Sequence, residues 1–262
     1  MPDWYLGTMG YGYKDWAGVF YPAGTRPRDY LAHYAQFFAA VEVDSTFYGT
    51  PRPGAVERWA EITPTGFQFC PKVPRQITHE AGLVDTAAQM AEFVGTMQLL
   101  GDKLGPILVQ LPPDFSRPQI DTLAGFLADL PPGQRYAVEF RHRSWHATET
   151  GELLQAHRVC WASTEYKYLP GRVYVTTDFI YIRWIGAHGV YDINDHERVD
   201  RTPQLREWHA DILQREQDGF HTVYGFFNND YAGFAPATCQ RFQALAGLPT
   251  PDLAPPTQGT LF

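Results

Sequence analysis

The sequence is poor in cysteine and has no long apolar run. Its three cysteines, Cys70, Cys160 and Cys239, are far apart, and none belongs to a C-x-x-C pair. This spacing argues against a disulfide scaffold and against a cysteine-ligated metal site. No stretch approaches the roughly 18 consecutive apolar residues of a membrane-spanning helix, and the first residues lack the basic start of a signal peptide. We therefore expect a cytoplasmic protein that does not contact a membrane.

Basic charge is also scarce. The chain has 21 Lys and Arg against 29 Asp and Glu, which gives a formal net charge of −8. A protein that coats nucleic acid needs a broad basic surface, because phosphate neutralisation supplies most of the non-specific affinity. Any nucleic-acid contact must therefore be confined to a local basic pocket. Hydrophobic residues (44%) and aromatic residues (15%) are plentiful, enough for a sizeable core and for rings that line a site.

Short apolar runs alternate with amphipathic segments along the chain. Runs such as ILVQL and FIYIRW are nearly continuous in apolar character, as in parallel strands covered on both faces. We expect strands at residues 4–9, 41–47, 67–73, 106–111, 136–140, 158–162, 179–184 and 222–227. We expect helices at residues 28–38, 54–62, 86–100, 118–130, 149–157, 202–218 and 234–245. This alternation predicts an α/β fold, a single (β/α)8 TIM barrel over residues 1–247, with an extended Pro-rich C-terminal tail over residues 248–262.

The candidate functional residues follow the expected strands. In a TIM barrel the active site lies at the carboxyl ends of the strands, and here those ends are polar while the strand bodies are apolar. The candidate catalytic residues are Glu42, Lys72, His79 and Glu139. The candidate substrate-binding residues are Thr8, Tyr48, Arg141, Trp145, Arg183, Asn228, Asn229 and Asp230. Arginine matches phosphate or carboxylate oxygens, and aromatic rings stack on sugars or nucleobases.

Two carboxylates have two alternative roles. Glu139 and Arg141 share one face of their strand, and if that face points into the barrel, Glu42 lies near them. Paired carboxylates beside a guanidinium can perform acid–base chemistry, or they can form a buried ion-pair network that fixes the barrel interior. Arg183 likewise either binds an anion or neutralises Glu139. Both alternatives stay open, and Lys72 or His79 is expected to assist proton transfer.

No metal ion and no cofactor is expected. The histidines in or near the loops after the strands, His79, His142, His188 and His196, lack a tight ligand spacing such as H-E-x-x-H. The glycines at positions 7, 10 and 12 are not followed by the lysine of a phosphate loop.

The motifs together resemble the YecE-like family, domain of unknown function 72. The matching stretches are GTMGYGYKDW (7–16), VEVDSTFYGTP (41–51), CPKVPRQITH (70–79), LGPILVQLPPDF (104–115), AVEFRHRSW (137–145), TTDFIYIRW (176–184) and VYGFFNNDYAGFA (223–235). The resemblance implies a TIM-barrel fold and assigns no reaction. It also implies kinship with endonuclease-IV-like barrels, but the dense His, Asp and Glu set that several zinc ions require is not found.

The last five residues, QGTLF, resemble the Q-x-x-L-F pentapeptide that docks proteins on the bacterial sliding clamp. In such a peptide Gln258 would form hydrogen bonds, and Leu261 and Phe262 would fill an apolar pocket. A Pro-rich leader lowers the entropy lost on docking. The alternative is that Leu261 and Phe262 pack on the chain's own barrel.

The sequence therefore predicts an enzyme that binds a phosphate-bearing sugar or a nucleic-acid fragment at the mouth of the barrel. The expected chemistry is acid–base or hydrolytic, as in a phosphoester hydrolase or a sugar-phosphate-processing enzyme. Two alternatives are a non-enzymatic accessory protein recruited to the sliding clamp and a sensor that binds an anion or a sugar.

Overall fold

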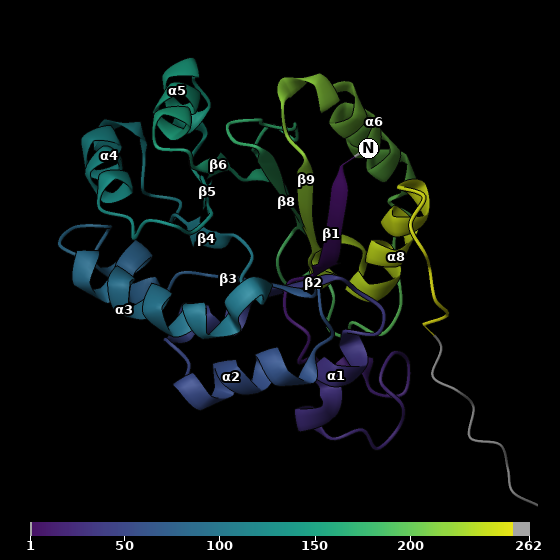
Figure 1. The fold of residues 1–262 in the computed structure, drawn as a ribbon. Coiled ribbons are helices and arrows are strands. Elements are labelled where there is room, and N and C mark those ends of the chain that lie inside the picture. The colour runs from purple at the N-terminus through teal and green to yellow at the C-terminus, as the bar shows by residue number, and fades with distance from the viewer. Residues whose placement is uncertain (1, 254–262) are drawn as a thin grey trace, which may run out of the picture.

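A computed structural model describes residues 2–253 of the chain. Parallel strands occupy its centre and helices surround them (Figure 1). The strands are β1 (Asp3–Thr8), β2 (Ala40–Val43), β3 (Gln68–Pro71), β4 (Ile107–Gln110), β5 (Tyr136–Glu139), β6 (Cys160–Trp161), β7 (Ser163–Tyr166), β8 (Phe179–Gly186) and β9 (Thr222–Phe227). The α/β class predicted from the sequence is confirmed.

The strands form three parallel sheets rather than one. Their orders are β1-β9-β8-β7, β2-β3 and β4-β5-β6. Isolated bridges join Met9 to Glu42 and Lys72 to Leu108, and so link β1 to β2 and β3 to β4. Thr8 and Trp184 both lie opposite Phe227, so the carboxyl ends of β1, β8 and β9 meet at one edge. Because every pairing is parallel, the residues that follow the strands gather at the same end.

The helices are α1 (Tyr30–Tyr34), α2 (Pro53–Ile62), α3 (Ala87–Met97), α4 (Ile120–Ala128), α5 (Thr148–Ala156), α6 (Thr202–Gln214), α7 (Asn229–Ala232) and α8 (Ala235–Leu245). Seven of these helices lie within or near the predicted ranges, although α1 and α6 end four residues early, and α7 was not predicted. Proline lies in the first turn of α2, α6 and α8, where its missing N–H costs no helical hydrogen bond. No helix within residues 2–253 is both long enough and apolar enough to cross a membrane.

The two faces of each strand pack against different surroundings. Along β8, Ile180, Ile182 and Trp184 pack in a cluster with side chains of the helices, whereas Phe179 and Tyr181 belong to a second, interior cluster. Side chains alternate between the faces of a strand, so residues two apart share a face. Because both faces pack against buried side chains, these strands are apolar on both sides. The candidate functional site lies at the carboxyl end of the interior face.

Two segments differ from the predicted strands. The strand expected at residues 41–47 ends at Val43, and Asp44–Tyr48 forms a 3-10 helix instead. Thr46 stabilises this turn because its hydroxyl donates to the carbonyls of Val43 (2.7 Å) and Lys72 (2.6 Å). The strand expected at residues 158–162 begins only at Cys160 and, after a break at Ala162, continues as β7.

The first residues of the predicted tail lie against the rest of the chain. Leu248 and Leu253 pack on the core, and the side-chain amide of Gln240 donates to the carbonyl of Pro251. The pentapeptide with Gln258, Leu261 and Phe262 lies outside the described residues.

Candidate functional site

The interior face of the strands ends in a buried layer of charge. Arg183, two residues after Tyr181 in β8, contacts one carboxylate from β2 and one from β5. Its Nη2 and Nε atoms lie 2.7 and 2.9 Å from the two oxygens of Glu42, and its Nη1 donates to Glu139. The Tyr181 hydroxyl donates to Glu42 at 2.7 Å. One guanidinium therefore joins two carboxylates that are far apart in the sequence, and all three groups are shielded from water.

Arg141 contacts this layer with one of its three side-chain nitrogens. Its Nε donates to Glu139, and its guanidinium lies 4.3 Å from the centroid of the Tyr166 ring. A ring face attracts a cation, so Tyr166 holds the guanidinium in place. Within residues 2–253 the two Nη atoms of Arg141 make no hydrogen bond.

Lys72 follows β3 and reaches the same place. Its Nζ lies 4.1 Å from the centroid of the Phe47 ring and 3.9 Å from Asp44 Oδ1, and the residue is only 8% exposed. Asp44 Oδ1 is buried and accepts no hydrogen bond from the described residues. Arg183 Nη2 also lies near this oxygen, at 3.8 Å. A buried acceptor without a hydrogen bond is costly, so Asp44 Oδ1 is suited to accept one from a molecule in the pocket.

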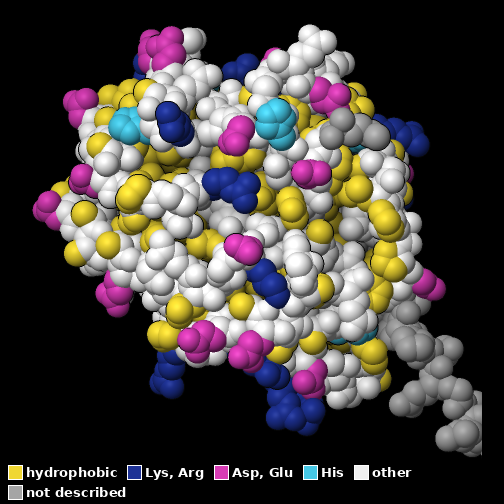
Figure 2. Space-filling view, viewed as in Figure 1, with side chains coloured by type: hydrophobic (Ala, Val, Ile, Leu, Met, Phe, Trp, Pro, Cys, Tyr) yellow, Lys and Arg dark blue, Asp and Glu magenta, His cyan; other side chains and the backbone are white. Residues whose placement is uncertain are grey.

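These groups surround a pocket of about 490 Å³ at the carboxyl ends of the strands. Its lining comprises Met9, Asp44, Phe47, Tyr48, Lys72, Arg75, His79, Gln110, Pro113, Arg141, Tyr166, Arg183, Ile185, His188 and Asn228. Six of the predicted site residues line it: Tyr48, Lys72, His79, Arg141, Arg183 and Asn228. Four Lys or Arg side chains and one carboxylate line the pocket. Arg75 and Arg183 are paired with carboxylates. Lys72 and Arg141 keep N–H donors that an anion can use. On the face shown in Figure 2, by contrast, basic and acidic side chains are interspersed.

Glu42 and Glu139 do not line the pocket. They lie beneath its floor, where they orient Arg183 and Arg141, so the ion-pair interpretation of this pair agrees with the geometry. Thr8 is also fully buried, and its hydroxyl donates to the carbonyl of Gly10 at 2.6 Å.

Three other predicted ligand-binding residues are used in packing or in turns. Trp145 is buried against Phe115, and its indole N–H donates to the Phe115 carbonyl at 2.8 Å. The side-chain oxygen of Asn229 accepts from the indole of Trp16 at 3.3 Å. Asp230 accepts from a backbone N–H of the turn after β8 at 3.2 Å. None of the three lines the pocket, because each side chain is used in these contacts.

Burial and neighbouring charges shift the titration of the layer. Burial raises the pKa of Glu42 to about 7, although Arg183 acts to lower it. Burial acts in the same direction on Glu139, but Arg141 and Arg183 outweigh it and hold its pKa below the usual value. Burial and the adjacent Arg183 lower the pKa of Lys72. The two carboxylates thus titrate in opposite directions because Glu139 has two guanidiniums and Glu42 has one.

His79 provides a neutral base at the rim. Its Nδ1 lies 2.8 Å from Thr78 Oγ1, and its ring meets the edge of Phe47. Burial and the charge of Lys72 lower the pKa of His79, which favours the neutral imidazole at pH 7. In the described part of the chain, no three His, Cys, Asp or Glu side chains are grouped closely enough to hold a metal ion.

The predicted site omits several lining residues, among them Asp44, Phe47, Arg75, Gln110, Tyr166 and His188. Strand periodicity contains a signal for some of them. Gln110 comes two residues after the interior Leu108, and Tyr166 is the last residue of β7. Phe47 and Tyr48 lie on the 3-10 helix, where strand alternation no longer applies.

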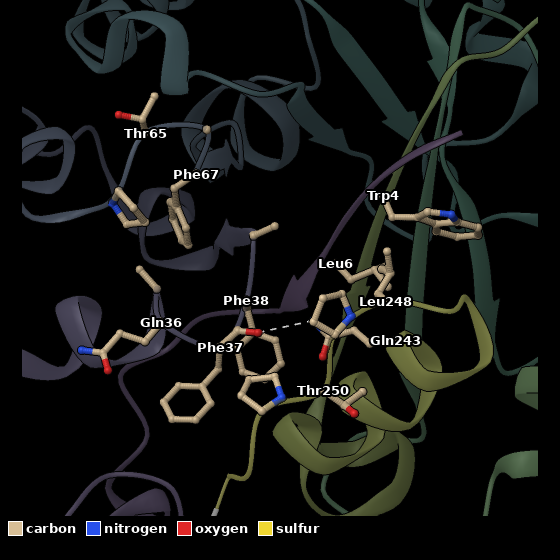
Figure 3. A pocket seen from close by; sticks show the side chains of 16 residues that line it. Trp4, Leu6, Gln36, Phe37, Phe38, Thr65, Phe67, Gln243, Leu248 and Thr250 are labelled. Carbon is tan, nitrogen blue, oxygen red and sulfur yellow. Dashed lines mark hydrogen bonds between the residues drawn. The ribbon is translucent and has the colours of Figure 1, made fainter. Parts of the chain in front are cut away.

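A larger hollow of about 710 Å³ lies at the other end of the strands (Figure 3). It is bounded by the residues just before β2 and β3 and by Leu248–Pro251. Its lining is apolar apart from amides, hydroxyls and backbone, with Trp4, Leu6 and Phe67 in its walls. No ionisable side chain of the described residues lines it.

Comparisons with known proteins agree with the sequence motifs. The model of the family described as "Protein of unknown function DUF72" matches residues 5–260. The chain is 38% identical to UPF0759 protein YecE of Escherichia coli over 117 residues, 45% of this chain and 43% of YecE. It is 32% identical to UPF0759 protein YunF of Bacillus subtilis over 152 residues, 54% of this chain and 51% of YunF. The matched part spans about half the length of these relatives.

Solved structures show the same fold. A DUF72 family protein of Thermotoga maritima has a TM-score of 0.80 at 28% identity, with 94% of this chain and 99% of that chain covered. One from Enterococcus faecalis has a TM-score of 0.79 at 21% identity, with 96% and 98% covered, and shows likeness of fold alone. Because the family model covers nearly the whole sequence, the chain belongs to the DUF72 family.

Proposed function

We propose that the protein is an enzyme whose pocket at the carboxyl ends of the strands binds a phosphate-bearing sugar or a nucleic-acid fragment. The observation that carries the proposal is the convergence of Lys72 and Arg141, both with unused N–H donors, beside the unpaired oxygen of Asp44. Phosphate oxygens suit the two cations, and a sugar hydroxyl suits Asp44. The proposal includes closure of the three sheets into one (β/α)8 barrel, which the bridges between them support.

Each side chain has a role that follows from its contacts. Arg141 and Lys72 bind the phosphate, and Asn228 contributes an amide at the rim. Tyr48 is 79% exposed at the pocket edge, so its ring can stack on a sugar or base. His79 transfers a proton in acid–base or hydrolytic chemistry. Glu42, Glu139 and Arg183 keep the site in shape, because all three donor nitrogens of Arg183 already contact carboxylates.

Binding of ribose 5-phosphate tests this assignment. Arg141→Met is expected to weaken binding at least tenfold, since a hydrogen bond to a charged group contributes about 1.5–3 kcal/mol. Isothermal titration calorimetry of both proteins with ribose 5-phosphate, ribose and inorganic phosphate measures the change. Arg58→Met is the matched control, because Arg58 lies on the surface of α2. Equal affinity of the wild type and Arg141→Met contradicts the site. Binding without turnover identifies a sensor.

We also infer a second function, recruitment to a bacterial sliding clamp, from the QGTLF sequence with Gln258, Leu261 and Phe262. In this proposal residues 1–247 form the barrel domain and residues 248–262 the docking tail. A cytoplasmic location goes with it, and the free thiols of Cys70, Cys160 and Cys239 suit a reducing compartment.

Deletion of residues 258–262 is expected to abolish clamp binding while leaving phosphate binding unchanged. Surface plasmon resonance against immobilised clamp measures the first property, and calorimetry measures the second. Swapping Leu261 and Phe262 for alanine keeps the chain length and serves as the finer variant. If the truncated protein binds the clamp as well as the full chain does, or if the full chain does not bind it, the recruitment proposal is wrong. Neither result bears on the proposal for the pocket.

A further inference from the structure

Lys72 is an unusual lysine in this chain because nothing neutralises it closely. Its nearest carboxylate oxygen within residues 2–253 is Asp44 Oδ1, at 3.9 Å, beyond hydrogen-bond distance. The Phe47 ring covers one side of the ammonium, and the backbone N–H of Lys72 is fixed by Thr46 at 3.0 Å. The side chain is therefore held in the pocket, with its terminal nitrogen free to meet a ligand.

The surroundings make the ammonium of Lys72 easier to deprotonate. Burial disfavours the charged form and Arg183 repels it, and together they outweigh the nearby carboxylates and lower the pKa of Lys72. A desolvated lysine next to another cation is a nucleophile toward carbonyl carbon. Proton transfer also needs a carboxylate close to that nitrogen. Asp44 Oδ1, which accepts no hydrogen bond from the described residues, lies 3.9 Å from it.

We infer that Lys72 forms an imine with the aldehyde or ketone of an open-chain sugar phosphate whose phosphate is bound by Arg141. This inference rests on the pocket of the proposed function. It narrows the substrate to carbonyl compounds, and it assigns Lys72 to the carbonyl carbon and leaves the phosphate to Arg141. The Nζ lone pair attacks the carbonyl carbon, and the carbonyl π electrons move to oxygen. Asp44 takes a proton from nitrogen and returns it to that oxygen. Asp44 then carries the remaining proton from nitrogen to the hydroxyl. The hydroxyl leaves as water while the nitrogen electron pair forms the C=N bond, without any change in oxidation state.

The other lysines provide internal comparisons. Lys103 donates to the carbonyls of Ala60 and Thr63 at 2.5 and 2.6 Å, so its nitrogen is occupied. Lys167 is exposed beside Tyr168, where water and a higher pKa favour the ammonium. Selective reaction at Lys72 therefore distinguishes a built site from general amine reactivity.

Reductive trapping tests the inference. The full-length protein is incubated at pH 7 with glyceraldehyde 3-phosphate or glyceraldehyde, reduced with borohydride, and mapped by peptide mass spectrometry. A trapped imine adds the mass of the probe less one oxygen atom. We expect the phosphorylated probe to label Lys72 at least tenfold more than Lys167. Wild-type mapping needs no variant, so a failure of Lys72→Arg to fold does not affect this measurement.

Variants then assign the roles. Lys72→Arg is expected to lose the label, Asp44→Asn to slow its appearance at least tenfold, and Lys167→Arg to leave labelling of Lys72 unchanged. Label spread evenly over exposed lysines, with ribose 5-phosphate still bound by calorimetry, overturns the imine and leaves the anion site standing. Lys72 labelled equally by both probes, with no phosphate bound, upholds the imine and overturns the phosphate assignment.

Discussion

Replacing Arg183 by methionine is expected to lower the free energy of unfolding by about 3–5 kcal/mol at pH 7. The side chain is 3% exposed, and both carboxylates that it contacts are fully buried. Among residues 2–253, removing the cation leaves Glu42 with the Tyr181 hydroxyl and Glu139 with Arg141 as their remaining hydrogen-bond partners. A buried carboxylate without its partner must either remain charged in a poor environment or take up a proton, and both cost folding energy.

Urea denaturation followed by tryptophan fluorescence measures this loss. Arg58→Met is the control, because the Arg58–Glu61 pair on α2 is 68% exposed at both side chains and a surface pair contributes roughly 0–1 kcal/mol. The double variant Arg183→Met, Glu42→Gln is expected to be more stable than Arg183→Met alone, since one of the two stranded charges is gone. If Arg183→Met and Arg58→Met shift the urea midpoint equally, the buried layer does not stabilise the fold in this way.

The α/β class with parallel strands was predictable because the local patterns agree with one another. Residues Ile107–Gln110 of β4 are buried along their whole length, which is what a continuous apolar run in a parallel strand predicts. The break at Ala162 was not predictable, because Ser163 and Thr164 are polar residues that the fold buries. Whether the three sheets meet in one closed barrel depends on side-to-side contacts that a one-dimensional pattern does not contain.

The charged layer was partly predictable from alternation. Period two places Glu139 and Arg141 on one face and Glu42 on the matching face of its own strand, and the structure brings all three near Arg183. Which of these charged residues line the pocket and which are buried below it was not predictable. A strand pattern gives the face of a side chain but not its depth, so it did not show that Glu42 and Glu139 lie beneath the pocket while Lys72 and Arg141 line it.

Loop residues were the least predictable. Trp145 follows β5 as a surface aromatic would, yet its ring packs between Phe115 and Phe140. Thr46 shows the opposite case, since its hydroxyl fixes the position of Lys72 across 26 residues of sequence. Such contacts arise only when two loops are brought together, so sequence spacing alone indicates which residue types are available and not which of them meet a ligand.

The second large effect is a change of stability with pH. It arises because Glu42 is a buried acid that shares the guanidinium of Arg183 with Glu139. In the folded protein its pKa is about 7, against about 4.5 when it is exposed. The folded state therefore holds a proton that the unfolded chain releases. Protonation of Glu42 contributes fully to the stability of the folded state below pH 4.5. This contribution, about 3 kcal/mol in all, is lost as the pH rises to about 7. Glu139, whose pKa is lowered, changes stability only below this range.

Comparing wild type with Glu42→Gln isolates this effect. Histidines with lowered pKa values, such as His79 and His146, make both proteins more stable as the pH rises through the same range, so the raw curves hide the glutamate. The difference between the two proteins removes that contribution. From pH 5 to pH 8, urea denaturation is expected to show wild type losing about 2.5 kcal/mol relative to Glu42→Gln, because part of the total loss has already occurred below pH 5. If the stability of both proteins changes with pH in the same way, Arg183 keeps both buried carboxylates ionised, and the prediction that Glu42 binds a proton in the folded state is wrong.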